Sequence, residues 1–355
     1  MQWRNGHNPA MALFPPPDSP ELKRILRPAR EPVRHVDDAL VHSLVLADPA
    51  AYLKFMENGL RQITAGRMQL TLPAKSVFAD GPGRGDFRVM PCVTQSAGRI
   101  VKSVKVVGTN LAQRNVPDQL TVGKSLLLHP EENYVSHVFD ANALSSIRTG
   151  ACVALGTRLL AAQRRRLLFA GAGRVGFYSA VLCLALGQIE SMRFSDPVHE
   201  RAASLARFLA DRHPAICFTA GPPEDGQADV VILATSSSAA FCRPPGWGAQ
   251  LVISVGADTD YQSELDAAWA GRADIVLDTL DSARLGDLRS WLEEGRIRKE
   301  DLRDLFDILR RPREAAGPVL FVSTGSALFD NLTMAYLAER LPPERHSSET
   351  KSSSL

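Results

Sequence analysis

Three glycines with the spacing Gly171-x-Gly173-x-x-Gly176 follow the apolar run 167–170 and precede the apolar segment 177–186. This order predicts a strand, a tight turn and a helix, the arrangement that binds the pyrophosphate of a dinucleotide. Gly171 would allow the sharp turn, Gly173 would leave room for the phosphates, and Gly176 would let the helix pack closely on the strand. A structural glycine turn is the alternative, and the flanking strand and helix favour nucleotide binding.

The residues after this turn would bind and select the dinucleotide. Arg174 and Val175 are candidate cofactor contacts, because they directly precede the helix expected from Gly176, whose start presents unpaired N–H groups to the phosphates. Asp196 ends the next apolar run, near the roughly 20-residue offset of a carboxylate that accepts hydrogen bonds from a ribose 2′-hydroxyl and repels a 2′-phosphate. We therefore expect NAD rather than NADP, a preference that Arg193 on the same strand would weaken. The other candidate cofactor contacts are Thr149 and, beside the nicotinamide, Thr235 and Ser236.

Two cations could hold the carboxylate of a substrate. A hydride leaves or joins the Cα of an amino acid only if the carboxylate is clamped and the nitrogen can exchange protons. The planar fork of Arg148 suits a bidentate carboxylate, and Lys105 supplies a second positive charge. Alternatively, Arg148 pairs with a surface acid and Lys105 is an exposed strand residue. A cation in the first turns of a helix is unfavourable unless an anion lies there too, which favours ligand binding by Arg148.

Asp258 is the candidate for proton transfer. It follows the apolar strand 251–255, so it should lie at the carboxyl edge of the sheet, where catalytic groups gather in open α/β folds. An Asp after a strand is also a common cap of the next helix. Position alone leaves both interpretations open.

The elements that position these residues begin with a helix from Asp48-Pro49 to about Ala65. Five β-rich runs follow it with no helix between them, which predicts a mostly antiparallel sheet. These runs are 68–78, 87–93, 100–107, 125–129 and 134–139. Asp140 is then expected to cap a long helix, 141–162, that leads into the strand before Gly171.

From residue 167 onward strands alternate with helices, which predicts a parallel, doubly wound Rossmann sheet of the α/β class. The expected strands are 167–170, 192–196, 216–219, 230–234, 251–255, 275–277 and 319–322. The expected helices begin at Gly176, at Pro197 and near Ser263, and the last one spans 326–341. The proline-rich residues 1–35 indicate an extended arm, and residues 346–355 a disordered tail.

Composition excludes several classes of function. The 355 residues carry a net charge of +2, which gives no indication of nucleic-acid or membrane partners. The five cysteines never form a CxxC motif, so we expect no disulfide framework, no zinc site and a cytoplasmic location. His129 and His137 have no carboxylate or cysteine beside them, so no metal is expected there either. The start of the chain lacks the apolar segment of a signal peptide.

Several of these segments, in this order, resemble the ornithine cyclodeaminase/mu-crystallin family over residues 48–341. The motifs that carry the resemblance are Val89-Met90-Pro91, Lys105 within 102–106, Ser146-Ile147-Arg148-Thr149-Gly150-Ala151, the turn from Gly171 to Gly176, Ala234-Thr235-Ser236-Ser237, Val255-Gly256-Ala257-Asp258 and Gly325-Ser326-Ala327-Leu328-Phe329-Asp330. The resemblance implies a homodimer of two-domain subunits. A substrate-binding and dimerisation domain would comprise 36–150 and 324–345, and a Rossmann NAD-binding domain would comprise 151–323.

The resemblance also implies NAD(P)-dependent chemistry on a small amino-acid substrate. Lys105 and Arg148 would bind the substrate carboxylate, and Asp258, together with Lys105, would handle protons at the substrate nitrogen or at an attacking water. The nearest candidates for an N-terminal substrate-binding arginine of the family are Lys75 and Arg88. Asp330 would seat the last helix or take part in catalysis, and both roles stay open.

Two loops depart from the pattern of the ornithine-converting members. Asp258 is followed by Thr259-Asp260-Tyr261-Gln262 instead of Pro-Gly-Lys, and residues 108–115 replace a Gly-Leu-Pro type loop. The stretch 107–151 resembles more closely the dehydrogenase that oxidises N-(2-amino-2-carboxyethyl)-glutamate to give 2,3-diaminopropionate. We therefore hypothesise an NAD-dependent oxidation of a secondary amine to an imine that water then hydrolyses. The alternatives are an ornithine cyclodeaminase, a related imine or ketimine reductase, and a mu-crystallin-like binding protein with little turnover.

Overall fold

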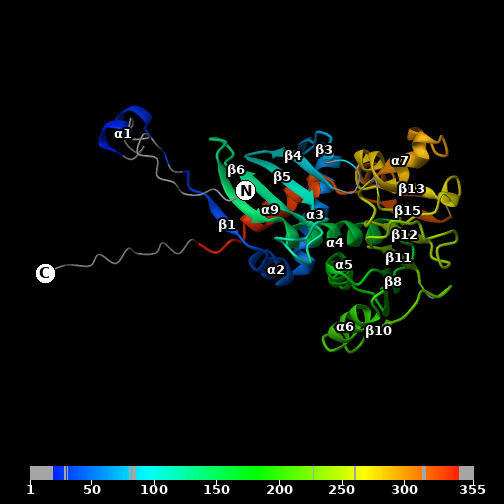
Figure 1. Ribbon diagram of the computed structural model, residues 1–355. Coiled ribbons are helices and arrows are strands. Elements are labelled where there is room, and N and C mark those ends of the chain that lie inside the picture. Colours follow the sequence, from blue (N-terminus) through cyan, green and yellow to red (C-terminus); the bar gives the residue numbers. More distant parts are fainter. Residues whose placement is uncertain are drawn as a thin grey trace.

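The computed structural model describes residues 19–27, 29, 31–79, 81, 85–226, 228–259, 261–313 and 317–343. This part of the chain forms a seven-stranded mixed sheet from its first part and an eight-stranded parallel sheet from its second part (Figure 1). The predicted α/β class, with a doubly wound parallel sheet and a separate N-terminal sheet, is confirmed.

The first sheet has the strand order β1-β7-β6-β5-β4-β2, with β3 beside β4. Its strands are β1 (Arg34–Val36), β2 (Gln69–Thr71), β3 (Ser76–Ala79), β4 (Asp86–Ser96), β5 (Arg99–Thr109), β6 (Thr121–Leu128) and β7 (Val135–Asp140). Its neighbouring strands run antiparallel except β1 and β7, which are parallel. Because side chains alternate between the two faces of a strand, β4 and β5 bury Arg88, Met90 and Lys105 on the same face.

Helices cover that buried face. α9 (Ala327–Ala338) packs on β4 and β5, and α4 (Ala141–Leu160) contacts α9, β6 and β7. α2 (Asp38–Leu46) and α3 (Pro49–Thr64) pack on α4 and α9. α3 begins as expected, because the Asp48 carboxylate accepts a hydrogen bond from Ala51 N and Pro49 takes the first helical position. None of the helices that the structure describes has the length and apolar character needed to cross a membrane.

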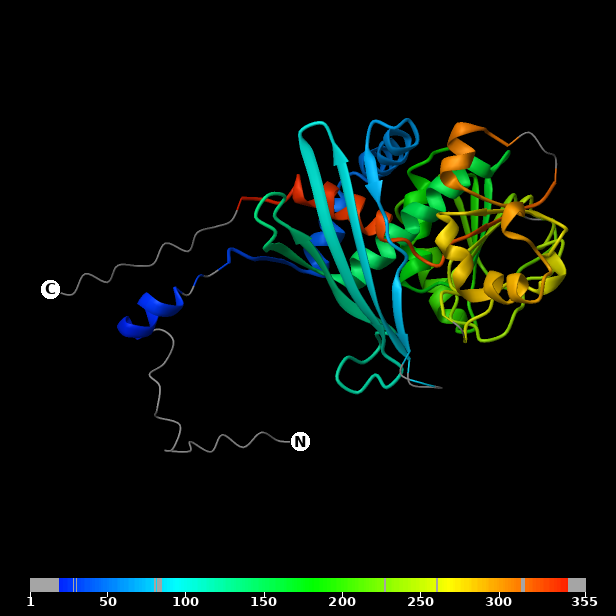
Figure 2. The same cartoon turned by 90° about the horizontal axis from the view of Figure 1, so that it is seen from above.

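The second sheet has the order β10-β9-β8-β11-β12-β15-β13-β14, with parallel neighbours throughout. Its strands are β8 (Arg166–Ala170), β9 (Ser191–Ser195), β10 (Cys217–Ala220), β11 (Val230–Leu233), β12 (Leu251–Ser254), β13 (Asp274–Leu277), β14 (Leu302–Asp304) and β15 (Val319–Val322). The helices that accompany it are α5 (Arg174–Leu184), α6 (His199–Ala210), α7 (Gly286–Glu293) and α8 (Leu305–Arg310). The strand order reverses between β8 and β11, which places the expected ligand crevice outside their carboxyl ends. Figure 2 shows the two sheets side by side.

The described part of the predicted arm contains regular structure. α1 (Pro20–Leu26) is a short helix that Ser19 caps, and it stands apart from both sheets in Figures 1 and 2. Arg34 begins β1, which extends the first sheet beside β7 and buries Val36. The prediction of an extended arm is wrong for these segments, because Ser19-Pro20 is itself a helix-start signal. Residues 1–18 and the predicted tail lie outside the described residues.

Two local predictions also need correction. Asp140 occupies the N-cap position of α4 but makes no capping bond, because its carboxylate pairs with Lys124; Ala143 N donates instead to Asp38 Oδ1 at 2.8 Å. No helix begins near Ser263, since only a 3₁₀ turn, Ala267–Trp269, forms in that region. The backbone there is held in another conformation by Asp287, whose Oδ2 accepts hydrogen bonds from the N–H groups of Glu264 and Leu265.

Candidate active site

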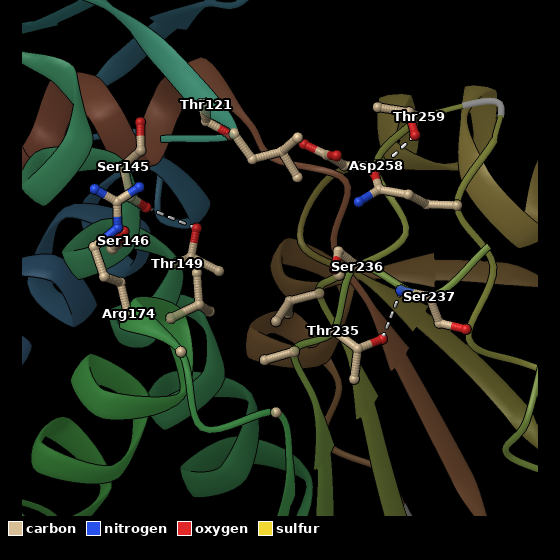
Figure 3. A pocket seen from close by; sticks show the side chains of 18 of the residues that line it. Thr121, Ser145, Ser146, Thr149, Arg174, Thr235, Ser236, Ser237, Asp258 and Thr259 are labelled. Carbon is tan, nitrogen blue, oxygen red and sulfur yellow. Dashed lines mark hydrogen bonds between the residues drawn. The ribbon is translucent and has the colours of Figure 1, made fainter. Parts of the chain in front are cut away.

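A cavity of about 1060 Å³ lies between the two sheets, at the carboxyl ends of β8, β9, β11, β12 and β15. Side chains of β4, β5, β6 and α4 form its other wall. In Figure 3, Thr149 and Ser145 lie on one side of the cavity, and Thr235, Ser236 and Asp258 lie on the opposite side. The cavity is therefore at the place where an open α/β sheet binds its ligand.

The glycine turn has the geometry that the sequence predicts. Gly171 has a φ of +106°, and a Cβ there would lie 2.3 Å from the carbonyl oxygen of Ala234. At Gly176 a Cβ would lie 2.2 Å from the carbonyl oxygen of Gly171. At Gly173, by contrast, a Cβ would meet no described atom within 4 Å. Gly171 and Gly176 are thus required by the fold, whereas Gly173 faces open space and is free to serve a ligand.

Helix α5 starts directly after this turn. Gly173 is its N-cap and provides no side-chain capping bond, and the first intrahelical bond runs from Phe177 N to the carbonyl oxygen of Gly173. The backbone N–H groups of Arg174, Val175 and Gly176 therefore remain for an anion. The Arg174 guanidinium lines the cavity and pairs with the Gln119 side chain across it.

Asp196 lies beside the glycine turn and lines the cavity. Its Oδ2 accepts from Ala172 N at 3.0 Å and its Oδ1 from Val198 N at 2.8 Å. These two bonds orient the carboxylate and leave lone pairs on both oxygens for hydroxyl donors. Arg193, which would weaken the preference for NAD, forms an ion pair with Glu224.

The expected cofactor contacts Thr149, Thr235 and Ser236 come from both walls. Thr149 donates its hydroxyl to Ser145 O at 2.8 Å, one turn earlier in α4. Thr235 Oγ1 donates to the buried Glu264 carboxylate at 2.8 Å and accepts from Ser237 N at 3.2 Å. Ser236 lies next to Thr235 on the cavity wall (Figure 3). The structure thus brings together Thr149, Thr235, Ser236 and the glycine turn.

Two cations and one carboxylate form a buried cluster at the inner end of the cavity. Lys105 Nζ lies 3.2 Å from Asp330 Oδ1, and Arg148 Nε lies 3.4 Å from the same oxygen. The side chains of Lys105 and Asp330 are only 2% and 1% exposed. Burial lowers the pKa of Lys105 to about 8 although the Asp330 charge opposes it. With two cations facing one carboxylate, the cluster has a surplus positive charge that a substrate carboxylate would neutralise.

Arg148 does not lie where the dipole argument put it. It is the eighth residue of α4, beyond the first turn in which a helix dipole acts, so that argument does not apply. Its guanidinium lies against Gly325, where a Cβ would be 2.9 Å from Nη2 and 3.1 Å from Nη1. Among the described residues, no hydrogen bond from either terminal nitrogen is found. The planar fork remains available for a carboxylate.

Asp258 meets Arg88 across the cavity. Arg88 Nη1 donates to Asp258 Oδ2 at 2.9 Å, while Nε and Nη2 donate to Asp86 Oδ2 at 3.0 and 2.9 Å. Burial alone would raise the pKa of Asp258, but the charges of Arg88 and Lys75 hold it below its usual value. The Asp258 side chain is 37% exposed. It is therefore an ionised carboxylate that a ligand in the cavity can reach.

Lys75 and Arg88, the candidate counterparts of an N-terminal substrate-binding arginine, both donate hydrogen bonds to other parts of the protein. Arg88 already donates to two carboxylates, so its charge is fully compensated. Lys75 Nζ donates to Thr324 O at 2.6 Å, to Thr324 Oγ1 at 3.1 Å and to Gly325 O at 3.2 Å. Burial lowers the pKa of Lys75 to about 8. Both residues hold the walls of the cavity, Arg88 through Asp258 and Lys75 through the segment between β15 and α9.

Three acidic residues in or behind the cavity walls were not predicted from the sequence: Asp86, Asp278 and Glu264. Asp86 pairs with Arg88 and accepts from Thr109 Oγ1 at 2.7 Å, and the Asp-x-Arg spacing on one strand face would have suggested that pair. Asp278 is fully buried and accepts from Ser282 Oγ and Ser323 Oγ. Glu264 is also fully buried, beneath the loops that carry Thr235 and Asp258. Ser323 lies 45 positions from Asp278 and Thr235 lies 29 positions from Glu264, and local patterns do not reveal such pairings.

The residues present fit a nicotinamide dinucleotide. The space at Gly173 and the free N–H groups at the start of α5 suit a pyrophosphate, and Asp196 suits a ribose. Within the described residues, no group of three or more His, Cys, Asp or Glu side chains could hold a metal ion. Asp260, part of the loop that departs from the family pattern, lies outside the described residues, whereas Thr259, Tyr261 and Gln262 line the cavity.

Comparison with known proteins agrees with this geometry. A model of the ornithine cyclodeaminase/mu-crystallin family matches residues 36–342. The chain is 30% identical over 299 residues to Delta(1)-pyrroline-2-carboxylate reductase 2 of Burkholderia ambifaria, a match that covers 80% of this chain and 89% of the relative.

Two solved structures share the fold. An archaeal alanine dehydrogenase dimer with bound NAD is similar with a TM-score of 0.75 and 23% identity, over 86% of this chain and 95% of that one. Thermococcus litoralis Delta(1)-pyrroline-2-carboxylate reductase in complex with NADH and L-proline is similar with a TM-score of 0.75 and 19% identity, over 86% of this chain and 97% of that one.

Proposed function

The chain belongs to the ornithine cyclodeaminase/mu-crystallin family, and from that premise we propose that it is an NAD-dependent oxidoreductase acting at the Cα of an N-substituted amino acid. The secondary amine loses a hydride from Cα to NAD⁺ and a proton from nitrogen, which leaves an imine and NADH. Water then adds to the imine, which breaks down to a 2-oxo acid and a primary amine. With N-(2-amino-2-carboxyethyl)-glutamate, the products are 2-oxoglutarate and 2,3-diaminopropionate.

The observation that carries this proposal is the position of Asp258 opposite the carboxylate-binding cluster in one cavity. Asp258 is ionised and reachable, whereas Lys105 and Arg148 share a single buried carboxylate. A 2-amino acid bound with its carboxylate on the two cations can direct its nitrogen toward a base in the same cavity. Clamping one end and deprotonating the other are the two requirements of hydride transfer at Cα.

The charged residues of the site would have separate roles in the reaction. Asp258 would accept the proton of the substrate nitrogen, return it to the imine nitrogen, and then accept a proton from the attacking water. Lys105, with a pKa lowered to about 8, would hold the carboxylate while charged and could exchange a proton near neutral pH. When bound, the nicotinamide supplies the hydride acceptor. The carboxylate of Asp196 favours NAD over NADP as that cofactor.

A second candidate function is the reduction of a cyclic imine. The relative that is 30% identical is named as a Delta(1)-pyrroline-2-carboxylate reductase. Such a reaction is the same hydride transfer in the opposite direction, with Asp258 or Lys105 returning the proton to nitrogen. In an ornithine cyclodeaminase, by contrast, a distal amine attacks the imine and the hydride returns, so no NADH accumulates. A binding protein with little turnover would have no use for the ion pair that keeps Asp258 ionised.

Three reactions followed by the absorbance of NADH separate these functions. The enzyme is mixed with NAD⁺ and N-(2-amino-2-carboxyethyl)-glutamate, with NAD⁺ and ornithine, and with NADH and 1-pyrroline-2-carboxylate. We expect NADH to accumulate in the first, together with 2-oxoglutarate. Proline and ammonia without net NADH in the second would overturn this choice in favour of a cyclodeaminase. Consumption of NADH in the third alone would assign an imine reductase.

The assembly we infer is a homodimer. The similar alanine dehydrogenase is described as a dimer with bound NAD, and β3, β4 and β5 expose Phe78, Phe87 and Val106 outside the site. Light scattering of the full chain tests this inference, with a mass near twice that of one chain expected and a monomer contradicting it.

A further inference from the structure

Glu264 is a buried carboxylate to which the proposed reaction assigns no role. Its side chain has no exposed area, and it lies in the segment between β12 and the 3₁₀ turn at Ala267–Trp269. Four hydrogen bonds reach it. Oε1 accepts from Thr235 N at 2.7 Å and Thr235 Oγ1 at 2.8 Å, and Oε2 accepts from Ser254 Oγ at 2.7 Å and Gly256 N at 3.0 Å.

These partners belong to two neighbouring loops on one wall of the cavity. Thr235 follows β11 and leads to Ser236, whereas Gly256 follows β12 and leads to Asp258. The two loops pack tightly against each other at Glu264. A Cβ at Gly256 would lie 2.3 Å from Glu264 Oε1 and 2.2 Å from the carbonyl oxygen of Thr235. The carboxylate therefore links the loop assigned to the cofactor with the loop that carries the candidate base.

Hydrogen bonds also fix the backbone of Glu264 itself. Asp287, in the first turn of α7, accepts from Glu264 N at 3.0 Å, from Leu265 N at 2.9 Å and from Ser263 Oγ at 2.5 Å. The carbonyl oxygen of Glu264 accepts from Phe241 N and Cys242 N. With its backbone fixed by α7 and by residues 241–242, the side chain has one position from which it can reach both loops.

The four donors define what each oxygen of Glu264 must provide. Thr235 N and Gly256 N are backbone donors and cannot accept a proton, so each carboxylate oxygen must offer a lone pair. Burial raises the pKa of Glu264, and the hydrogen bonds from Ser254, Thr235 and Gly256 oppose that rise. A neutral amide at this position would turn one of its two ends into a donor facing a backbone N–H.

We propose that Glu264 is a positioning residue that fixes the Thr235 loop and the Asp258 loop relative to each other. Asp258 N donates to Gly256 O at 3.2 Å, so a displacement of Gly256 passes directly to the base. The inference rests on the proposed function for its catalytic consequence, whereas its consequence for cofactor binding does not require turnover.

The test is Glu264→Gln, which keeps the shape of the side chain. We expect the Kd for NADH, measured by quenching of protein fluorescence, to rise about tenfold or more, because one buried N–H loses its acceptor. We also expect kcat to fall more than KM for the amino acid rises. Ser254→Ala is the matched control, since it removes one donor and leaves both backbone contacts, and it should change the Kd less than about threefold.

A stability control separates positioning from folding. Leu209 of α6 is buried on the far side of the parallel sheet, and Leu209→Ala should lower Tm without changing the Kd for NADH. The proposal is overturned if Glu264→Gln lowers Tm as Leu209→Ala does and keeps wild-type Kd and kcat. Should Glu264→Gln not fold, Asp287→Asn replaces it with the same expectations. If the wild type binds NADH but turns over no amino acid, the proposed function is contradicted. The effect of Glu264→Gln on the Kd for NADH can still be measured in that case.

Discussion

Arg88 Nη1 lies 2.9 Å from Asp258 Oδ2, although the two residues are 170 positions apart, one on a strand of the first sheet and the other in a loop of the second. The contact joins β4 to the loop after β12 across the cavity. It also sets the charge of the candidate base, since the Arg88 guanidinium holds the pKa of Asp258 below its usual value against the effect of burial. The same contact therefore joins the two layers and favours the ionised form of the candidate base.

Replacing Asp258 by asparagine tests the assignment of the base. Asp258→Asn keeps a hydrogen-bond acceptor for Arg88 but removes the proton acceptor, so kcat should fall about 100-fold to 1000-fold. Binding of NADH, followed by fluorescence, should change less than about threefold, because the glycine turn is untouched. An activity within twofold of wild type would remove Asp258 from the mechanism.

The reductive direction should lose activity as the pH rises through about 8. Burial lowers the pKa of Lys105 to about 8, so Lys105 is charged below that pH and neutral above it. Neutral Lys105 no longer attracts the substrate carboxylate or provides a proton, and kcat/KM for imine reduction should fall. The profile of kcat/KM against pH from 6 to 10 measures this effect.

Lys75 is the control for that profile, because burial lowers its pKa to about 8 as well. Lys105→Gln should have low activity and no decline near pH 8, whereas Lys75→Gln should keep the decline. The opposite pattern would assign the titration to Lys75, and a decline in both variants would assign it to the substrate.

Replacing Arg148 by lysine tests the bidentate carboxylate. Lysine keeps the charge but loses the fork, so KM for the amino acid should rise about tenfold to a hundredfold, the scale of a hydrogen bond to a charged group. Arg158 lies on the same helix, half exposed and paired with Glu57, and Arg158→Lys should leave KM unchanged. Equal values of KM in the two variants would exclude Arg148 from substrate binding.

The first two glycines of the turn should respond differently to alanine. At Gly173 a methyl group meets no described atom within 4 Å and φ is −80°, so Gly173→Ala should keep the wild-type Tm. Its Kd for NADH should rise at least about tenfold, because the methyl group occupies the space for the phosphates. At Gly171 the φ of +106° and the Ala234 carbonyl make alanine destabilising by about 1–3 kcal/mol from backbone strain alone. Wild-type affinity in Gly173→Ala would place the dinucleotide elsewhere.

Local patterns were sufficient to predict the turn and seven of the eight strands of the second sheet, whereas β14 was not predicted. Alternating apolar runs and helices gave the order of β8, α5 and β9, and the glycine spacing located the phosphate site, because both signals lie within a few residues of each other. The faces of the strands were harder to predict. Lys102 and Lys105 are three apart on β5, and only the packing of α9 on this strand shows that Lys105 points inward.

The long-range polar contacts could not be predicted. Asp330 gathers Lys105 and Arg148 because α9 returns to the first sheet, and Glu264 meets Thr235 because two parallel strands end side by side. Neither pairing has a local signature, since each partner alone looks like an ordinary polar residue in a strand, loop or helix. The helix expected near Ser263 failed for the same reason: Asp287, from a distant helix, holds that backbone.

The most direct test of the central claim is the position of the transferred hydride. The enzyme is incubated with NADH deuterated at C4 of the nicotinamide and with 1-pyrroline-2-carboxylate or the imine of 2-oxoglutarate and 2,3-diaminopropionate, and the products are analysed by mass spectrometry and NMR. The account predicts one deuterium at the carbon next to the carboxylate, and its loss in Asp258→Asn. Deuterium at another carbon, or no transfer to either imine by enzyme that binds NADH, would contradict it.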